Sequence, residues 1–275
     1  MDKIFITNDI KLAQYAQESG IERIMVDLEV IGKEERQGHL NTVFSKHTFE
    51  DIENMKKVLS KSKLLVRINP IHNDSKEEID KVISLGADII MLPMFTTAEE
   101  VKKFIDYISK RATVCLLLET TQSLVRIDEI LEVKGIDEIH VGLNDLHLAM
   151  NLDFMFELLS GGIVEYLSKK IISKNIKFGF GGVARVGQGM IDATLILSEH
   201  IRLNSSMVIL SRDFKNYKES YEDIRDTIDL ENEICKINDF IDNFNETDFE
   251  KNKNQLKEKV AIIVSKIRDK KSYVL

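Results

Sequence analysis

The sequence contains an unbroken apolar run at residues 114–118 that ends directly in a carboxylate, Glu119. A short run of this kind is typical of a strand buried on both faces, as in a parallel sheet covered by helices on both sides. A second strand-like segment, residues 139–145, also ends in an acid, Asp145. The carboxyl ends of parallel strands meet at one edge, so we expect the two acids to lie side by side.

Runs of this kind recur along the chain and alternate with helix-like segments. The expected strands are residues 3–7, 24–29, 64–70, 88–93, 113–121, 139–145, 176–181 and 206–211. Helix starts between them are marked by capping residues, for example Thr97 with Glu100 in capping-box spacing. Eight such units in about 210 residues predict a (β/α)8 barrel, with a doubly wound open sheet as the competing architecture.

The composition changes after Phe214, where the sequence becomes charged, helical and poor in strands. Residues 256–267 place apolar side chains at helical spacing. We therefore expect a barrel domain at residues 1–214 and a C-terminal helical extension at residues 215–275. The extension is expected to pack on the barrel or against a neighbouring subunit.

Charge and hydropathy exclude several classes of partner. The net charge of −8 predicts no basic face for nucleic acid. No apolar run approaches the roughly 20 residues of a membrane span, and the N-terminus shows no signal peptide. Cys115 and Cys235 are expected to be unpaired thiols in a reducing compartment, so we predict a cytoplasmic protein without nucleic-acid or membrane partners.

Polar residues and glycines gather at the predicted carboxyl ends of the strands, where such barrels carry their chemistry. They are Asp27, Glu29, Arg67, Asn69, Glu119, Asp145, Gly179, Gly181 and Gly182. Carboxylates that converge repel one another unless a cation neutralises them, and oxygen ligands suit Mg²⁺ or Mn²⁺. Glu119 and Asp145 are the predicted metal ligands, and the alternative for each is to serve as the N-cap or as a first-turn acid of the following helix.

Arg67 is the predicted substrate-binding and catalytic cation of this site. A guanidinium fork beside a metal is suited to a planar carboxylate, although an ion pair with Glu29 or Glu119 is an alternative. Asp27 and Glu29 fall on one face of their strand. One of them is expected to orient a metal-bound water or Arg67, with a structural salt bridge as the other interpretation.

Two histidines in the polar segment after the second strand, His39 and His47, are candidates for the general base. We favour His39 because Arg36 lies in the same short loop. His140 stands in the middle of a strand and is expected to be a packed, internally hydrogen-bonded histidine.

The glycine cluster at residues 179–182 is expected to form a loop after the seventh strand. Loops at this place in a barrel often bind phosphate through backbone N–H groups, but the cluster lacks the Lys-Ser/Thr of a P-loop. It equally suits close packing against a bound carboxylate. Gly181 and Gly182, together with Asn144, are therefore predicted to bind substrate.

Five segments in order resemble the HpcH/HpaI aldolase and citrate lyase β-subunit family. They are Asp27-Leu-Glu29, Val66-Arg-Ile-Asn-Pro70, Met91-Leu-Pro93, Leu118-Glu119-Thr120 and Gly142-Leu-Asn-Asp-Leu146. The resemblance implies a metal-dependent (β/α)8 barrel that makes or breaks C–C bonds through an enolate. It implies that Glu119 and Asp145 bind Mg²⁺ or Mn²⁺ and that Arg67 polarises the substrate. The family and the helical tail together predict a homo-oligomer.

The leading hypothesis is thus a metal-dependent aldolase that acts on a 2-oxo (hydroxy) acid through a metal-stabilised enolate, with a small carboxylate as its substrate. One alternative is a citrate-lyase-like or phosphoenolpyruvate-type enzyme that uses residues 179–182 for phosphate. Another is a barrel without catalysis that serves as a binding or assembly subunit. Val30, where the citrate lyase branch has an acid, and Asn144 keep the last alternative open.

Overall fold

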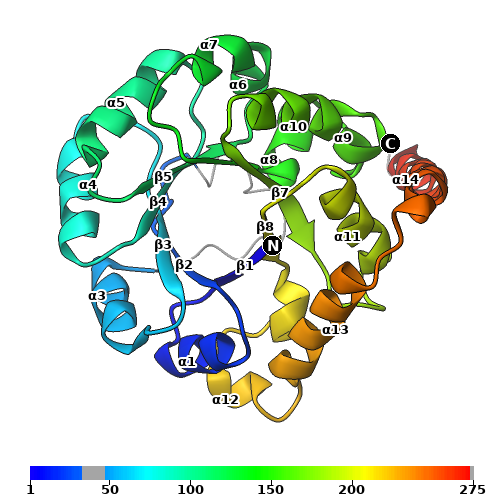
Figure 1. The fold of residues 1–275 in the computed structure, drawn as a ribbon, viewed down its shortest axis with the longest axis horizontal. Coiled ribbons are helices and arrows are strands. Elements are labelled where there is room, and N and C mark those ends of the chain that lie inside the picture. The colour runs from blue at the N-terminus through cyan, green and yellow to red at the C-terminus, as the bar shows by residue number, and fades with distance from the viewer. Residues whose placement is uncertain (33–46, 273–275) are drawn as a thin grey trace.

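The computed structural model describes residues 1–32 and 47–272 and shows eight parallel strands closed into a barrel (Figure 1). Each strand pairs with the next, and β8 pairs with β1 to close the ring. The strands are β1 (Asp2–Ile6), β2 (Arg23–Asp27), β3 (Lys63–Arg67), β4 (Ile89–Leu92), β5 (Thr113–Leu118), β6 (Glu138–Val141), β7 (Lys177–Val183) and β8 (Met207–Leu210). The predicted (β/α)8 barrel is confirmed, and the open sheet is excluded.

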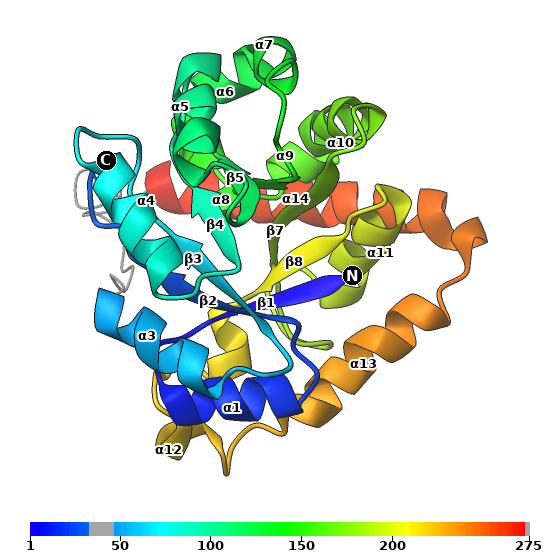
Figure 2. The same ribbon diagram turned by 60° about the vertical axis from the view of Figure 1, so that its left-hand side comes forward.

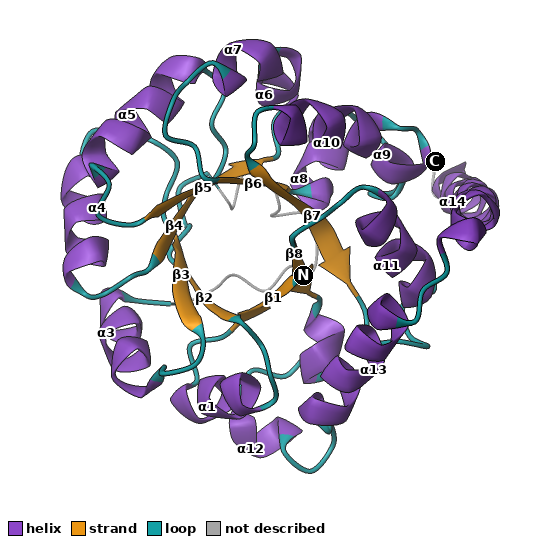
Figure 3. Ribbon diagram, in the orientation of Figure 1, coloured by secondary structure: helices purple, strands orange, loops and turns teal. Residues whose placement is uncertain are grey.

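Helices surround the strands on the outside of the barrel (Figure 3). They are α1 (Ile10–Glu18), α3 (Phe49–Val58), α4 (Ser75–Ser84), α5 (Ala98–Ile108), α6 (Thr121–Val125), α7 (Ile127–Leu131), α8 (Leu143–Ala149), α9 (Glu157–Ser160), α10 (Ile163–Ser173) and α11 (Ala193–Arg202). The capping box predicted at Thr97 and Glu100 is present at the start of α5.

The chain after β8 forms η1 (Arg212–Lys215), α12 (Tyr221–Ile224), α13 (Leu230–Asp242), η2 (Glu246–Asp248) and α14 (Phe249–Ser272). Helix α13 contacts α1 and α11, and α14 contacts α9 and α11 (Figure 2). Leu256, Val260 and Val264 bury one stripe of α14. Lys3 Nζ also donates to Asn238 Oδ1 of α13 at 3.0 Å, so the extension packs on the barrel of its own chain.

No helix within the described residues is long and apolar enough to cross a membrane.

The interior of the barrel is filled in layers by the inward-facing side chains. An apolar cluster fills the middle of the interior and consists of Ile4, Met25, Leu65, Ile89, Met91, Cys115, Leu117 and Met207. Since side chains alternate along a strand, the residues two positions before and after this cluster face the same interior. The first residues of β1, β2 and β6 therefore form a lower layer, and the residues at the carboxyl ends form an upper one.

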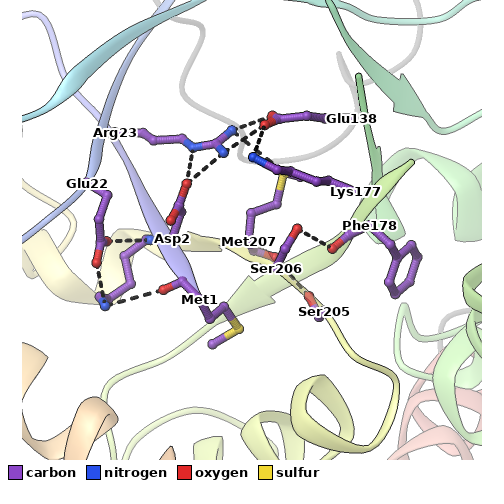
Figure 4. Close-up of polar contacts among 11 residues, drawn as sticks. Met1, Asp2, Glu22, Arg23, Glu138, Lys177, Phe178, Ser205, Ser206 and Met207 are labelled. Carbon is purple, nitrogen blue, oxygen red and sulfur yellow. Dashed lines mark hydrogen bonds and ion pairs between the residues drawn. The ribbon is translucent and has the colours of Figure 1, made fainter. Parts of the chain in front are cut away.

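The lower layer is a cluster of paired charges around Arg23, which is 2% exposed (Figure 4). Arg23 Nη2 donates to Glu138 Oε1 at 2.9 Å, and its Nε donates to Asp2 Oδ2 at 2.9 Å. Lys177 Nζ lies 3.7 Å from Glu138. The charges of this layer balance within the cluster, as expected at the end of such a barrel that serves stability.

Candidate active site

A cavity of about 630 Å³ opens at the carboxyl ends of the strands. The ends of β2, β3, β5, β6, β7 and β8, the start of α8 and the turn η1 line it. The predicted site residues along its walls are Asp27, Glu29, Arg67, Glu119, Asn144, Asp145, Gly181 and Gly182. His39, the favoured general base, lies outside the described residues, so its role stays a prediction.

Glu119 follows β5 directly and takes the inward-facing position of that strand, where it is 2% exposed. Its Oε1 accepts a hydrogen bond from the backbone N–H of Met94 at 3.2 Å. Helix α6 is capped by Thr120, whose Oγ1 accepts from Ser123 N, so capping does not explain Glu119. A Cβ on Gly142 would lie 2.7 Å from Glu119 Oε2, so only glycine leaves room for this carboxylate.

Burial raises the pKa of Glu119 well above its usual value, and the nearby carboxylates of Asp145 and Glu29 raise it further. Arg67 and the Met94 N–H lower it only in part. Among the described residues that line the cavity, Asp and Glu outnumber Lys and Arg by five to three.

Asp145 does not end a strand, and this part of the prediction is wrong. Strand β6 ends at Val141, Gly142 is the N-cap of α8, and Asp145 lies in the first turn of that helix. Leu143, which was assigned to the strand, is buried with Leu146 at helical spacing. Asp145 nevertheless lines the cavity and contributes to the raised pKa of Glu119, so the two acids share one site.

Arg67 at the end of β3 is held by the two acids of the β2 segment. Its Nε and Nη2 donate to the two carboxylate oxygens of Asp27 at 2.8 Å each, and Nη1 lies 3.3 Å from Glu29 Oε2. Burial alone lowers the pKa of Arg67, but Asp27, Glu29 and Glu119 together hold it above its ordinary value. Asp27 thus occupies one edge of the guanidinium. A substrate can accept hydrogen bonds only from the N–H groups of Arg67 that do not bond to Asp27.

His47 faces the cavity from the segment before α3. Its Nδ1 accepts a hydrogen bond from the backbone N–H of Asp27 at 2.9 Å. Burial lowers the pKa of His47, and Lys215 lowers it further against the opposing effect of Asp27. A neutral imidazole that accepts at Nδ1 carries its hydrogen at Nε2, so His47 can donate a hydrogen bond there, while its role as the alternative general base stays a prediction.

The glycine cluster lies inside β7 and not in a loop after it, so that prediction is wrong. Phe178 and Phe180 alternate with Gly179 and Gly181, and the phenylalanines are buried in the core between barrel and helices. This period of two is a strand pattern. A Cβ on Gly181, where φ is +45°, would lie 2.6 Å from Leu143 Cδ1, so the glycine permits close packing of α8 against β7.

His140 lies below the site in β6 and is completely buried. Its Nε2 is 3.2 Å from the carbonyl oxygen of Gly181, which confirms the expected internal hydrogen bond. Burial lowers the pKa of His140 to about 4, and therefore the ring is neutral at pH 7.

The cavity residues that the sequence interpretation did not single out include Ser211 and Lys215. Ser211 follows β8 directly, and Lys215 ends η1. Their position at the end of the last predicted strand and just after it was the available signal, because the loop after strand eight is a frequent ligand site in these barrels.

The donor set of the site fits a magnesium-like cation. Among residues 1–32 and 47–272, no three His, Cys, Asp or Glu side chains are grouped to hold a metal. Glu119 and Asp145 supply two carboxylates, and Mg²⁺ commonly takes one or two from the protein and completes its shell with water and substrate oxygens. Zinc, which requires three or four protein ligands, does not fit.

Several solved structures share the fold of this chain. An HpcH/HpaI aldolase from Desulfitobacterium hafniense DCB-2 superposes with a TM-score of 0.61 at 16% identity, covering 78% of this chain and 89% of that one. An HpcH/HpaI aldolase/citrate lyase family protein from Burkholderia cenocepacia J2315 gives 0.59 at 11%, covering 76% and 87%. The citrate synthase SbnG gives 0.59 at 15%, covering 78% and 87%.

Comparison with curated proteins gave no match. The sequence matches the family profile described as HpcH/HpaI aldolase/citrate lyase over residues 6–155, more than half of its 275 residues. The matched stretch runs from β1 to beyond α8 and contains every predicted acid of the cavity. The chain belongs to the HpcH/HpaI aldolase/citrate lyase family.

Proposed function

We propose that the protein cleaves, and in reverse forms, a C–C bond of a 2-oxo (hydroxy) acid through an enolate, with Mg²⁺ or Mn²⁺ as cofactor. The observation that carries the proposal is the excess of carboxylates over cations among the described residues of a cavity of small-molecule size. Glu119 and Asp145 would hold the cation, which when bound supplies a Lewis acid that stabilises negative charge on substrate oxygen.

The bond changes define what the residues of this chain must do. When a 4-hydroxy-2-oxo acid is cleaved, the hydroxyl loses its proton and becomes an aldehyde. The electron pair of the broken C–C bond moves toward the 2-oxo oxygen, which leaves an enolate, and a proton is then added to C3. The protein must therefore stabilise an oxygen anion and provide a proton acceptor and a proton donor.

Arg67 would stabilise the oxygen anion through the N–H groups that Asp27 leaves open. The two short hydrogen bonds to Asp27 fix the plane of the guanidinium before substrate arrives, which is the preorganisation that makes such donors effective. His47 would add a second, neutral donor through its Nε2–H. The proton-accepting role stays with His39 or a water molecule, as predicted.

Of the two alternatives, the citrate-lyase-like or phosphoenolpyruvate-type enzyme loses the phosphate loop predicted for it, because residues 179–182 lie in a strand; citrate-lyase-like chemistry stays a prediction. The non-catalytic alternative is decided by experiment.

The experiment is exchange of the methyl hydrogens of pyruvate for deuterium in D₂O, followed by ¹H NMR with Mg²⁺, with Mn²⁺ and with EDTA. This exchange reports enolate formation without any second substrate. We expect EDTA to abolish the exchange and Glu119→Gln to slow it by about 100- to 1,000-fold, the usual effect of removing a group that stabilises transition-state charge.

The matched control is Glu99→Gln, the same chemical change at an exposed position of α5, which should exchange at the wild-type rate. Exchange that EDTA or Glu119→Gln leaves unchanged would refute the proposed site. If folded wild-type protein gives no exchange at all with either metal, the non-catalytic alternative holds.

A further inference from the structure

We propose that the cavity has a second binding subsite, built from Lys215 and Ser211 beyond the end of β8, that holds an anionic group on the aldehyde partner. The group is a carboxylate or a phosphate, since both present oxygen anions to an ammonium and a hydroxyl. This inference rests on the proposed function, because only that function makes the second substrate an aldehyde.

Ser211 supplies a hydroxyl that is ready for a ligand. Met207 and Ile209 pack in the barrel interior, so Ser211, two positions further on, faces the same side. Its Oγ is buried and has no hydrogen-bond partner within the described part of the chain. A buried hydroxyl without a partner is uncommon and costs free energy, which a bound anion in the cavity would recover.

Lys215 supplies the positive charge. Lys215 is only 5% exposed and lines the cavity, although lysine side chains are seldom buried. Its ion-pair partner is Glu219, whose side chain is 50% exposed. A partner that lies half in solvent is weakly held, so an anion entering the cavity can replace Glu219 at the ammonium.

The cavity is lined by charges of both signs. Lys215 and the exposed Arg212, both of η1, line it together with the acids around Arg67. Lys215 is near enough to His47 to lower the pKa of that ring, which places the ammonium next to the region proposed for the reaction. An anionic group on the aldehyde is repelled by the acids and attracted to Lys215, so the substrate is oriented in one direction.

The size of the cavity agrees with a substrate longer than pyruvate. A volume of about 630 Å³ is in the middle of the range for small-molecule sites and much larger than a three-carbon acid requires.

The first test measures binding without catalysis. Inorganic phosphate and acetate are titrated by calorimetry into metal-free wild-type protein and into Lys215→Met, Glu219→Gln and Ser211→Ala. We expect Lys215→Met to weaken binding about 10- to 100-fold, as for loss of a hydrogen bond to a charged group, and Ser211→Ala to weaken it a few-fold. Glu219→Gln should strengthen binding because it removes the competing carboxylate.

The second test measures specificity. Condensation with pyruvate is compared for succinic semialdehyde against butyraldehyde, and for glycolaldehyde phosphate against glycolaldehyde, so that the carboxylate and phosphate sources are separated. We expect the wild-type kcat/KM to favour at least one anionic aldehyde by about 10-fold or more, and Lys215→Met to remove that preference. Lys218→Met is the matched control, since this exposed lysine does not line the cavity.

The outcomes separate the two proposals. If wild-type protein exchanges pyruvate hydrogens but treats charged and neutral aldehydes alike and binds anions no better than Lys215→Met, the subsite is refuted and the proposed function stands. If anion binding depends on Lys215 while pyruvate exchange is absent, the proposed function fails and the subsite stands. If Lys215→Met does not fold, the test uses the other two variants: Glu219→Gln should bind anions more tightly than the wild type, and Ser211→Ala more weakly.

Discussion

The two ends of the barrel both bury an arginine among carboxylates, but they balance charge differently. At the amino ends of the strands, Arg23 and Lys177 face Asp2 and Glu138, two cations against two acids (Figure 4). At the carboxyl ends, the described residues that line the cavity include five acids and three cations. The acids are Asp27, Glu29, Glu119, Asp145 and Glu219, and the cations are Arg67, Arg212 and Lys215.

The difference indicates which end needs a ligand. Charges that already pair within the protein gain nothing from an added ion, and the residues of the Arg23 cluster do not line the 630 Å³ cavity. The upper acids lie around a cavity, and burial, together with the nearby carboxylates of Asp145 and Glu29, raises the pKa of Glu119. Natural proteins keep such unfavourable clusters where function requires them, so the lower end is assigned to stability and the upper end to chemistry.

The largest expected effect is on the free energy of unfolding, when one charge of the Arg23 cluster at the lower end is removed. Arg23→Met leaves Glu138 buried without its main partner and should destabilise the fold by about 3–5 kcal/mol, measured by urea unfolding followed by circular dichroism. Pyruvate exchange per folded molecule should be unchanged. The double variant Arg23→Met/Glu138→Gln removes both charges and should recover most of the loss. A loss below about 1 kcal/mol in the single variant would show that the cluster does not carry stability.

The next effect is the pH dependence caused by His140, which lies between the two ends. The folded ring has a pKa of about 4, whereas the unfolded ring takes up a proton near pH 6.5. The unfolded state therefore binds more protons in this window, and stability falls as the pH drops from 6.5 to 4, by about 3 kcal/mol in total. The buried His200, whose pKa is lowered well below normal by burial, adds to the fall in the same direction.

The measurement for His140 is the free energy of unfolding at pH 7 and pH 4.5 in the wild type and in His140→Gln. Carboxylates elsewhere affect both proteins equally, so the difference isolates the histidine. The wild type should lose about 2–3 kcal/mol more than the variant. Equal losses would mean that His140 is protonated in the folded protein.

The sequence predicted those parts of the fold and site that depend on local pattern. The apolar runs predict parallel strands, and parallel strands place their carboxyl ends together, so Asp27, Arg67 and Glu119 were expected in one site and the structure brings them together. Asp145 was predicted at the carboxyl ends of the strands, where it lies, but as the last residue of a strand, which it is not. An apolar residue near the end of a strand can equally begin a helix, as Leu143 does.

The remaining features depend on how distant segments meet. The Arg23–Glu138 pair joins residues that are 115 positions apart and meet only across the closed barrel. The Asp27 N–H to His47 bond follows from the path of the chain into α3, which no motif records. Ser211 and Lys215 belong to no repeated pattern, and their importance comes from facing a cavity that exists only when β8 pairs with β1.

The smallest expected effect concerns the acids at the upper end, and it is measured as a change in protein stability rather than in activity. Without metal, Glu119→Gln should be more stable than the wild type by about 0.5–2 kcal/mol, because it removes a buried carboxylate that its neighbours repel. Mg²⁺ at ten times its Kd should stabilise the wild type by about 1.4 kcal/mol and raise its Tm, since the ion binds only the folded state. The variant should show no such rise, so that added Mg²⁺ narrows or closes the gap between the two proteins. A Tm that Mg²⁺ raises equally in both would place the ion elsewhere, and the unbalanced charge of the upper end would then need another partner.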